Sequence, residues 1–135
     1  MEAYNEHLSY IGVIARTNEL KPNMYSLQMK INWLLRLEQQ IKLKIIDTHE
    51  GPEIPEIPPM VAENQDIHEF SDTPMLVPEP FQDVYTHYLC SQIDYANGEY
   101  ERYNNSNAMF QAAYKEYANW YNRTYMPKAG QNNYF

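Results

Sequence analysis

Residues 26–49 read SLQMKINWLLRLEQQIKLKIIDTH, and the apolar residues of this segment recur with the period of one long helix, around which the rest of the chain must pack. Ser26 is a suitable N-cap, since its side-chain oxygen can accept a hydrogen bond from a free N–H of the first turn. An α-helix turns by about 100° per residue, so seven apolar residues fall on one side and predict a core-facing helix over residues 26–48. These residues are Ile31, Leu34, Leu35, Leu37, Ile41, Ile45 and Ile46.

Glu38 lies near the middle of that apolar arc. A buried carboxylate must be paired, hydrogen-bonded or protonated, because an isolated buried charge is costly. A general acid or base is the alternative, but no second carboxylate or histidine lies beside Glu38 at helical spacing. We interpret Glu38 as a structural polar contact, satisfied by an arginine or by tyrosine hydroxyls.

One further helix is predicted before this one in the chain, and two are predicted after it. Residues 4–20 place Tyr4, Leu8, Ile11 and Ala15 at helical spacing before Lys21-Pro22. Residues 80–96 begin with a proline, which suits a first helical turn, and Asn97-Gly98 ends that helix with left-handed backbone. A fourth helix over residues 99–125 then forms an antiparallel hairpin with the third. The fold class is therefore all-α, one domain of four helices.

Residues 49–79 form a long connection that contains most of the chain's nine prolines. Proline removes a backbone donor and holds the preceding residue extended, so regular helix is not expected here. A connection of this length in a small domain is often disordered or a binding element. Interspersed apolar residues favour a loop that reaches over its own bundle or a neighbour. Residues 127–135 have no regular pattern and are expected to be a flexible tail.

The predicted fourth helix, within GEYERYNNSNAMFQAAYKEYANWYNRTYMP (residues 98–127), is dense in aromatic rings. Helical geometry places most of them in one stripe, which we interpret as core that seals the hairpin onto the second helix. Tyr100 and Trp120 fall outside the stripe and are candidates for contact with a neighbouring subunit. Glu99 and Arg102 should pair, and Glu38 should pack against the stripe or Arg102. The stripe consists of Tyr103, Phe110, Tyr114, Tyr117, Tyr121 and Tyr125.

The charge of the chain is strongly segregated along the sequence. The formal net charge is −8, which repels a phosphate backbone and argues against sequence-specific nucleic-acid binding. No Lys or Arg occurs between Lys44 and Arg102, where thirteen of the eighteen carboxylates lie. This segment is either a solvated acidic loop or a patch that meets a basic flank of another subunit.

No catalytic or cofactor motif is recognisable. The histidines at positions 7, 49, 68 and 87 lie in no metal-binding arrangement, and the chain has no glycine-rich phosphate loop. Cys90 is the only cysteine, so no intrachain disulfide can form. No apolar run is long enough to span a membrane. The sequence therefore predicts no enzyme activity, no metal, no cofactor and no membrane association, in a reducing compartment.

Several strings resemble one protein family. LKPNMYS, KINWLLRLEQQI, IIDTHEG, LVPEPFQDVY, YLCSQIDYANGEYERYNNS and WYNRTYMP, in that order, are similar to head–tail connector, or adaptor, proteins of tailed phages and prophages of gut Firmicutes. The resemblance covers residues 10–127, and IDYANGEYERYNNS is its most specific part.

This resemblance implies a non-catalytic, adaptor-like helical bundle in the virion neck, present in the host cytoplasm before assembly. It implies a ring of about twelve copies between the portal and the other neck or tail-completion proteins, with subunits that can be monomeric until they meet the portal. Such adaptors often dock to the portal through a terminal segment, which makes Tyr134 and Phe135 candidate anchors. The alternative function is a small acidic phage inhibitor that mimics DNA and binds a host enzyme.

Overall fold

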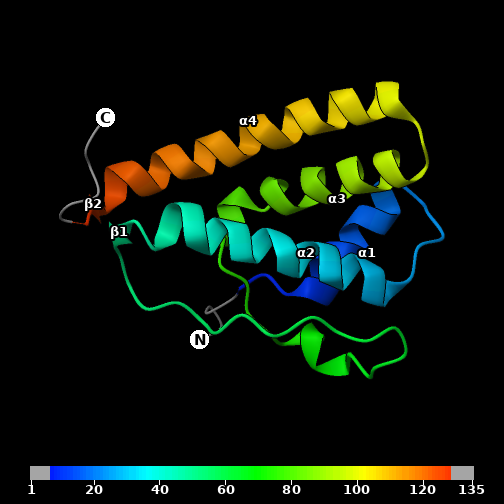
Figure 1. Ribbon diagram of the computed structural model, residues 1–135, viewed down its shortest axis with the longest axis horizontal. Helices are drawn as coiled ribbons and strands as arrows, with labels where there is room; N and C mark the ends of the chain where they lie inside the picture. Colours follow the sequence, from blue (N-terminus) through cyan, green and yellow to red (C-terminus); the bar gives the residue numbers. More distant parts are fainter. Residues whose placement is uncertain (1–6, 129–135) are drawn as a thin grey trace.

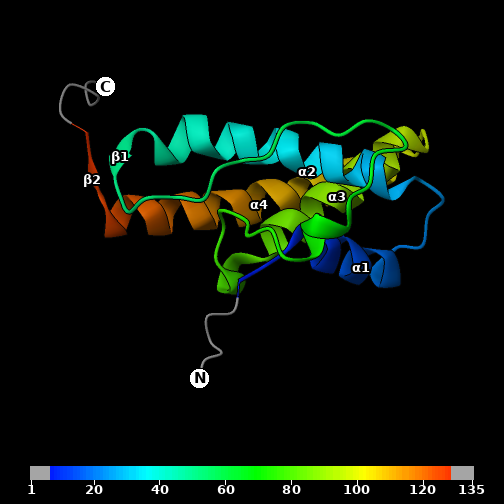
Figure 2. The same ribbon diagram turned by 90° about the horizontal axis from the view of Figure 1, so that it is seen from below.

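Four α-helices make up most of residues 7–128, the part of the chain that the computed structural model describes, which confirms the all-α prediction. In Figure 1, α3 lies between α2 and α4, and α1 packs at one end of the group. The colours show that α3 runs opposite to both α2 and α4 (Figures 1 and 2). No helix in the described range is long and apolar enough to cross a membrane. The helices are α1 (Tyr10–Leu20), α2 (Leu27–Ile41), α3 (Asp83–Ala96) and α4 (Tyr100–Thr124).

Shorter elements join these helices. A π-helical turn, η2, continues α2, and two 3-10 turns lie in the long connection before α3. Two very short strands pair at the end of the bundle where α4 finishes. The bounds are η2 (Lys42–Ile46), β1 (His49–Glu50), η3 (His68–Ser71), η4 (Glu79–Phe81) and β2 (Met126–Pro127).

The first helix differs from the prediction in its start and in its buried face. It begins at Tyr10 because Ser9 is the N-cap, whose Oγ accepts a hydrogen bond from the Gly12 N–H at 3.1 Å. Ser9 also pairs with Pro74 in an isolated bridge, which keeps the entering chain extended. Of the expected helix over 4–20, residues 4–6 lie outside the described range. Ala15 is exposed, and the buried residues are Tyr10, Val13, Ile14 and Thr17.

The second helix is capped as predicted, with the Met29 N–H donating to the Ser26 Oγ at 3.0 Å. Its end differs, because the α-helix stops at Ile41 and a π turn follows. In a continuous α-helix Ile46 would lie at the edge of the apolar side, about 140° from Ile41. The wider π turn leaves both Ile45 and Ile46 buried against the core.

The third and fourth helices form the predicted hairpin. Gly98, with φ of +75°, occupies the left-handed conformation that reverses the chain, and its N–H donates to the Tyr95 carbonyl at 3.0 Å. α4 begins and ends within one residue of the predicted bounds, whereas α3 starts at Asp83 instead of residue 80. Pro80 lies in η4, where the Gln82 N–H donates to the Glu79 carbonyl at 3.0 Å. The proline therefore starts a 3-10 turn that leads into α3.

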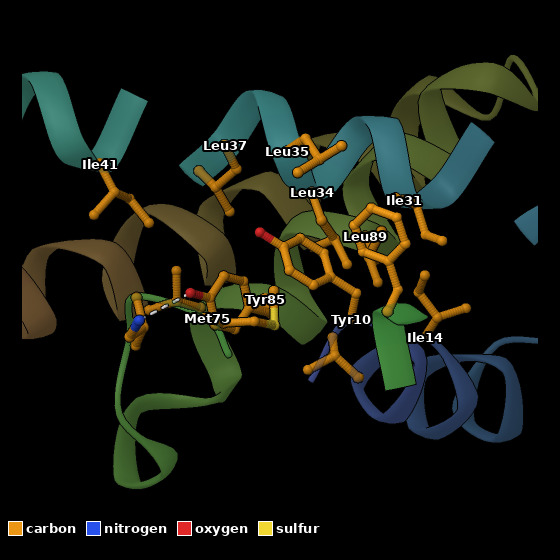
Figure 3. Close-up of a cluster of buried hydrophobic side chains, with 14 of the residues drawn as sticks. Tyr10, Ile14, Ile31, Leu34, Leu35, Leu37, Ile41, Met75, Tyr85 and Leu89 are labelled. Carbon is orange, nitrogen blue, oxygen red and sulfur yellow. Dashed lines mark hydrogen bonds between the residues drawn. The ribbon is translucent and has the colours of Figure 1, made fainter. Parts of the chain in front are cut away.

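The main core lies where α1, α2 and α3 meet (Figure 3). Aliphatic residues of α2 face Tyr85 and Leu89 of α3, while Tyr10 and Ile14 enter from α1. Met75 of the long connection closes one side. Burial of this apolar surface is the main favourable term in folding, and it orients all three helices. The fully buried α2 residues include Ile31, Leu34, Leu35, Leu37 and Ile41.

The connection between β1 and α3 is held against the bundle along its length. The repeat PEIPEIPP at residues 52–59 leaves Ile54 and Ile57 half-buried and Glu53 and Glu56 exposed. A spacing of three residues is the period of a polyproline II helix, so one side of the segment rests on the bundle and the other carries charge. Asn32 then clamps the backbone of Val61, donating to its carbonyl at 2.9 Å and accepting from its N–H at 2.8 Å.

The chain after α4 is also tied down, which corrects the expectation of a free tail from residue 127. Met126 pairs with Glu50 and Pro127 with His49 in an antiparallel ladder. The Lys128 N–H donates to the Thr48 carbonyl at 3.0 Å. We call β1, β2 and η2 together the tip. Residues 129–135 lie outside the described range.

The contact between Gly51, which follows β1, and Tyr121 of α4 gives a prediction about packing. A side chain at Gly51 would overlap the hydroxyl of Tyr121, which is buried and has no hydrogen-bond partner among residues 7–128. Gly51→Ala should therefore lower the free energy of unfolding by about 1–3 kcal/mol. Tyr121→Phe removes the unpaired oxygen, so alone it should be neutral or slightly stabilising and should recover part of that loss. Urea unfolding of both single variants and the double variant measures this, and equal losses in both backgrounds would contradict it.

Candidate interaction surfaces

Glu38 is completely buried and is therefore not accessible to a substrate. Its hydrogen bonds show that it joins parts of the fold. Its Oε1 accepts a hydrogen bond from the Tyr85 hydroxyl at 2.6 Å, and its Oε2 accepts one from the Leu76 N–H at 2.9 Å. The Tyr85 oxygen in turn accepts from the Val77 N–H at 2.9 Å, the dashed line in Figure 3. One carboxylate thereby fastens α2, α3 and the long connection together.

Burial raises the pKa of Glu38 to about 7, and the two hydrogen bonds oppose that rise. Burial, and to a smaller extent the nearby charge of Glu38, raise the pKa of Tyr10 above its ordinary value. The partner of Glu38 differs from the prediction, because Tyr85 belongs to α3 and not to the α4 stripe. Arg102 pairs instead with Glu99, at 3.7 Å on the exposed surface.

The α4 stripe packs largely as core. Phe110, Tyr117 and Tyr121 are buried, whereas Tyr103, Tyr114 and Tyr125 are half-buried. Their ring partners come from α3 and from η4. The ring centroid of Phe110 lies 5.2 Å from that of Tyr88 in α3, and the ring centroid of Tyr117 lies 5.6 Å from that of Phe81 in η4. These ring contacts therefore join α4 to α3 and η4 more than to α2, which corrects the expected direction of packing.

The two off-stripe rings have different environments. Trp120 is half-buried and contacts Phe81 at 5.2 Å and Tyr117 at 6.0 Å between ring centroids, so most of its surface is used by the fold. Tyr100 is 61% exposed and lies 5.9 Å from Tyr95, which is itself 59% exposed. Of the two candidates, Tyr100 remains available for a partner.

Tyr95 lines an open groove of about 720 Å³, and Tyr100 neighbours this groove through its ring contact with Tyr95. One wall is the first half of α2, a second is the connection around Met60, and a third is the end of α3. Aromatic rings and methionines line it together with polar side chains, and aromatic residues and methionine are enriched at protein interfaces. We call it the aromatic groove; its main lining residues are Tyr25, Met29, Trp33, Met60, Val61 and Tyr95.

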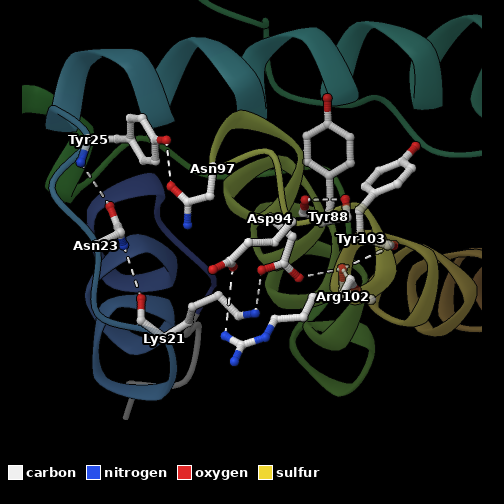
Figure 4. Close-up of polar contacts among 11 residues, drawn as sticks. Lys21, Asn23, Tyr25, Tyr88, Asp94, Asn97, Arg102 and Tyr103 are labelled. Atoms are coloured by element: carbon white, nitrogen blue, oxygen red, sulfur yellow. Dashed lines mark hydrogen bonds and ion pairs between the residues drawn. The ribbon is translucent and has the colours of Figure 1, made fainter.

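The walls of the aromatic groove are held by polar contacts that the sequence did not reveal. Tyr25 donates from its hydroxyl to the Asn97 Oδ1 at 2.6 Å (Figure 4). Its ring packs edge-on against Trp33, with ring centroids 5.8 Å apart. Lys30 is buried and donates to the side-chain oxygens of Asn18 at 2.9 Å and Asn23 at 3.0 Å. Burial lowers the pKa of Lys30. These contacts fix the link between α1 and α2.

A second polar cluster holds α1 onto the hairpin. Lys21 donates to Asp94 at 2.7 Å, and the Ser106 hydroxyl donates to the other Asp94 oxygen at 2.9 Å (Figure 4). Asp94 is 1% exposed, so loss of either donor would leave a buried carboxylate incompletely paired. The sequence pattern gives no sign that Asp94 is buried, because its partners Lys21 and Ser106 come from other helices or helix ends.

The remaining acidic residues form a surface that is fixed in place. Asp47 pairs with Lys42 at 2.9 Å, but the carboxylates of the long connection point into solvent. Because that connection is anchored at Asn32 and Glu38, its charges keep a defined position on the molecule. The exposed set is Glu50, Glu53, Glu56, Glu63, Asp66, Glu69, Asp72, Glu79 and Asp83.

His49 and His68 lie far apart in the fold, whereas His87 and Cys90 of α3 line one small pocket with Asp94 and Arg102. His49 is buried and its ring nitrogens contact the Ile45 carbonyl and Asn122 at the tip, while His68 contacts Asp66 at the surface. Burial raises the pKa of the Cys90 thiol. No group of three or more potential metal ligands occurs among residues 7–128.

Comparison with known proteins yields no match to a family model, a curated protein or a solved structure. The exposed surfaces of the chain are therefore the main structural guide to its function.

The buried carboxylate predicts a pH effect on stability. The folded pKa of Glu38, about 7, lies above its ordinary value of 4.5. Its contribution is therefore complete below about pH 4.5 and is lost as the pH rises through about 7, a change on the order of 3 kcal/mol. Glu38→Gln should fold, because the amide can donate to Tyr85 and its oxygen can accept from Leu76, and should lack this component. Urea unfolding from pH 4.5 to 8 tests this, with exposed Glu69→Gln as control; an unchanged slope in Glu38→Gln would contradict it.

Proposed function

We propose that this chain is a structural protein of a phage virion neck, a head–tail connector that binds the portal and forms a ring around the DNA channel. The strings quoted from residues 10–127 support the family, and the helical fold is compatible with it. In this function the chain contributes surfaces and no chemistry.

The observation that carries the proposal is the aromatic groove beside exposed Tyr100 and Tyr95. Exposed rings joined to a concave apolar surface are typical of protein–protein contact sites. The walls are held by hydrogen bonds between side chains, so little order must be gained on binding. A subunit that must assemble on a preformed portal ring needs such a surface.

The fixed acidic connection supports the same function. Negative charge repels the phosphate backbone, so a channel wall that carries it would let packaged DNA pass without adhering. In the assembled ring the connection would face the lumen, and the groove would face protein. Tyr134 and Phe135, the proposed portal anchors, lie outside the described residues.

One observation favours the second candidate, an acidic inhibitor that mimics DNA. The exposed carboxylates are held in position on the bundle, as a mimic requires, although they lie on an extended segment instead of a helix. Such a protein would bind one host enzyme as a single copy and would not assemble on a portal.

Mixing the purified chain with the portal protein of the same phage tests the proposal. Negative-stain electron microscopy should show portal rings with an added layer, and Tyr100→Ser together with Met29→Glu should abolish the layer. Met109→Glu, at an exposed methionine on α4 away from the groove, should leave it unchanged. Truncation after Lys128 should weaken portal binding if Tyr134 and Phe135 are anchors. Portal rings that gain no density, with binding only to a host nuclease or polymerase, would favour the mimic.

A further inference from the structure

The turn between α3 and α4 contains the one Asn-Gly pair of the chain, Asn97-Gly98. Asparagine before glycine is the pair most prone to spontaneous deamidation, because glycine has no side chain to shield its backbone nitrogen from the preceding amide. Both residues are exposed, and a Cβ built at Gly98 would meet no other atom within 4 Å. Water therefore reaches the atoms that would react.

The reaction needs no reagent other than water. The Gly98 nitrogen bonds to the Cγ of Asn97, and the bond from Cγ to Nδ2 breaks. The Gly98 proton passes through solvent to the leaving amide group, which departs as ammonia and leaves a cyclic imide. Water then opens the ring. Cleavage between the Gly98 nitrogen and Cγ gives aspartate, whereas cleavage of the main-chain bond gives isoaspartate, whose backbone is longer by one methylene.

The folded turn keeps the two reacting atoms apart. Asn97 has ψ of −8°, which places the Gly98 nitrogen on the side of the Asn97 backbone nitrogen and not beside the Asn97 side chain. The Gly98 N–H donates to the Tyr95 carbonyl at 3.0 Å, and the Glu99 N–H donates to the Asp94 carbonyl at 3.0 Å. Ring closure requires rotation about ψ of Asn97, so it requires that these bonds open first.

Tyr25 holds the side chain of Asn97 from a different part of the chain. Its hydroxyl donates to the Asn97 Oδ1 at 2.6 Å, as the dashed line in Figure 4 shows. Tyr25 is itself fixed, because its N–H donates to the Asn23 Oδ1 at 3.1 Å and its ring packs against Trp33. The Asn97 amide can therefore turn towards Gly98 only after this hydrogen bond is released.

We propose that Asn97 is a deamidation site that the folded α3–α4 turn protects, and that Tyr25 is the positioning residue that holds its amide away from Gly98. The reaction then occurs in molecules whose turn has opened, at a rate set by the free energy of that local opening. This inference goes beyond the proposed function and does not depend on it.

The product would alter the wall of the aromatic groove. Deamidation places a negative charge at the C-terminal end of α3, where the helix dipole disfavours it. Isoaspartate also lengthens the backbone within a tight turn, which moves position 97 relative to Tyr25. Because Tyr25 and Ala96 line the groove, a partner that binds there would meet a changed surface.

Incubation of the full chain at mildly alkaline pH, folded in buffer or unfolded in guanidinium chloride, tests the protection. Chymotrypsin cleavage after Tyr95 and Tyr100 releases residues 96–100, and chromatography with mass spectrometry separates the asparagine, aspartate and isoaspartate forms. The folded chain should deamidate at least about tenfold more slowly than the unfolded chain, because only the opened fraction reacts. Equal rates in the two states would overturn the proposal.

The role of Tyr25 has its own variant and matched control. Tyr25→Phe should deamidate about two- to tenfold faster in the folded state, the effect of losing one hydrogen bond, and at an unchanged rate when unfolded. Tyr100→Phe removes a hydroxyl near the same turn that is not bonded to Asn97, and it should react at the parent's rate. A Tyr25→Phe rate no higher than that of Tyr100→Phe would contradict the role of Tyr25.

Gly51→Ala separates local opening of the turn from unfolding of the whole chain. This variant should lower global stability at the tip, far from Asn97, so its folded rate of deamidation should equal the parent's if only the turn must open. Acceleration by Gly51→Ala as large as that by Tyr25→Phe would show that global unfolding limits the reaction, and the assigned role of Tyr25 would then be wrong.

Discussion

The buried carboxylate of Glu38 is the constraint on which the arrangement of the molecule depends. It lies within the apolar face of α2, where an unsatisfied charge would be prohibitively costly. Its two acceptor oxygens are matched by Tyr85 of α3 and by the backbone of Leu76. Because hydrogen bonds are directional, this pair of contacts fixes the register of α2, α3 and the long connection more specifically than apolar packing alone can.

The position of the long connection follows from that anchor. Glu38 holds it at Leu76, Asn32 holds it at Val61, and Phe70 packs under Tyr10 with ring centroids 5.2 Å apart. The connection thus becomes a wall of the bundle, with apolar residues inward and carboxylates outward. The same placement brings Met60 to the rim of the aromatic groove. One fold feature therefore creates both surfaces on which the proposed function depends.

The aromatic residues of the hairpin divide between folding and exposure along α4. Towards its end, Tyr117, Trp120 and Tyr121 contact Phe81, His49 and one another. Near its start, Tyr100 and Tyr95 contact each other but remain largely exposed. Phe81 and the residues around Gly51 pack against the end of α4, whereas Tyr95 and Tyr100 near Gly98 are 59% and 61% exposed. This asymmetry places the candidate contact surface at the α3–α4 turn.

The presence and order of the four helices could be predicted from local signals, because the apolar period, the Ser26 cap and Gly98 act within a few residues. The sequence also indicated that Glu38 must be satisfied and that Glu99 and Arg102 should pair. Tertiary packing selected the tyrosine that satisfies Glu38 and buried Lys30 and Asp94. It also laid residues 49–79 over their own bundle, one of the two positions that the sequence favoured for them. Those outcomes join residues far apart in the chain, such as Asn32 with Val61 and Lys21 with Asp94. The buried face of α1 and the π turn after α2 differ from the prediction for the same reason, because a local sequence pattern does not determine which elements pack against a segment.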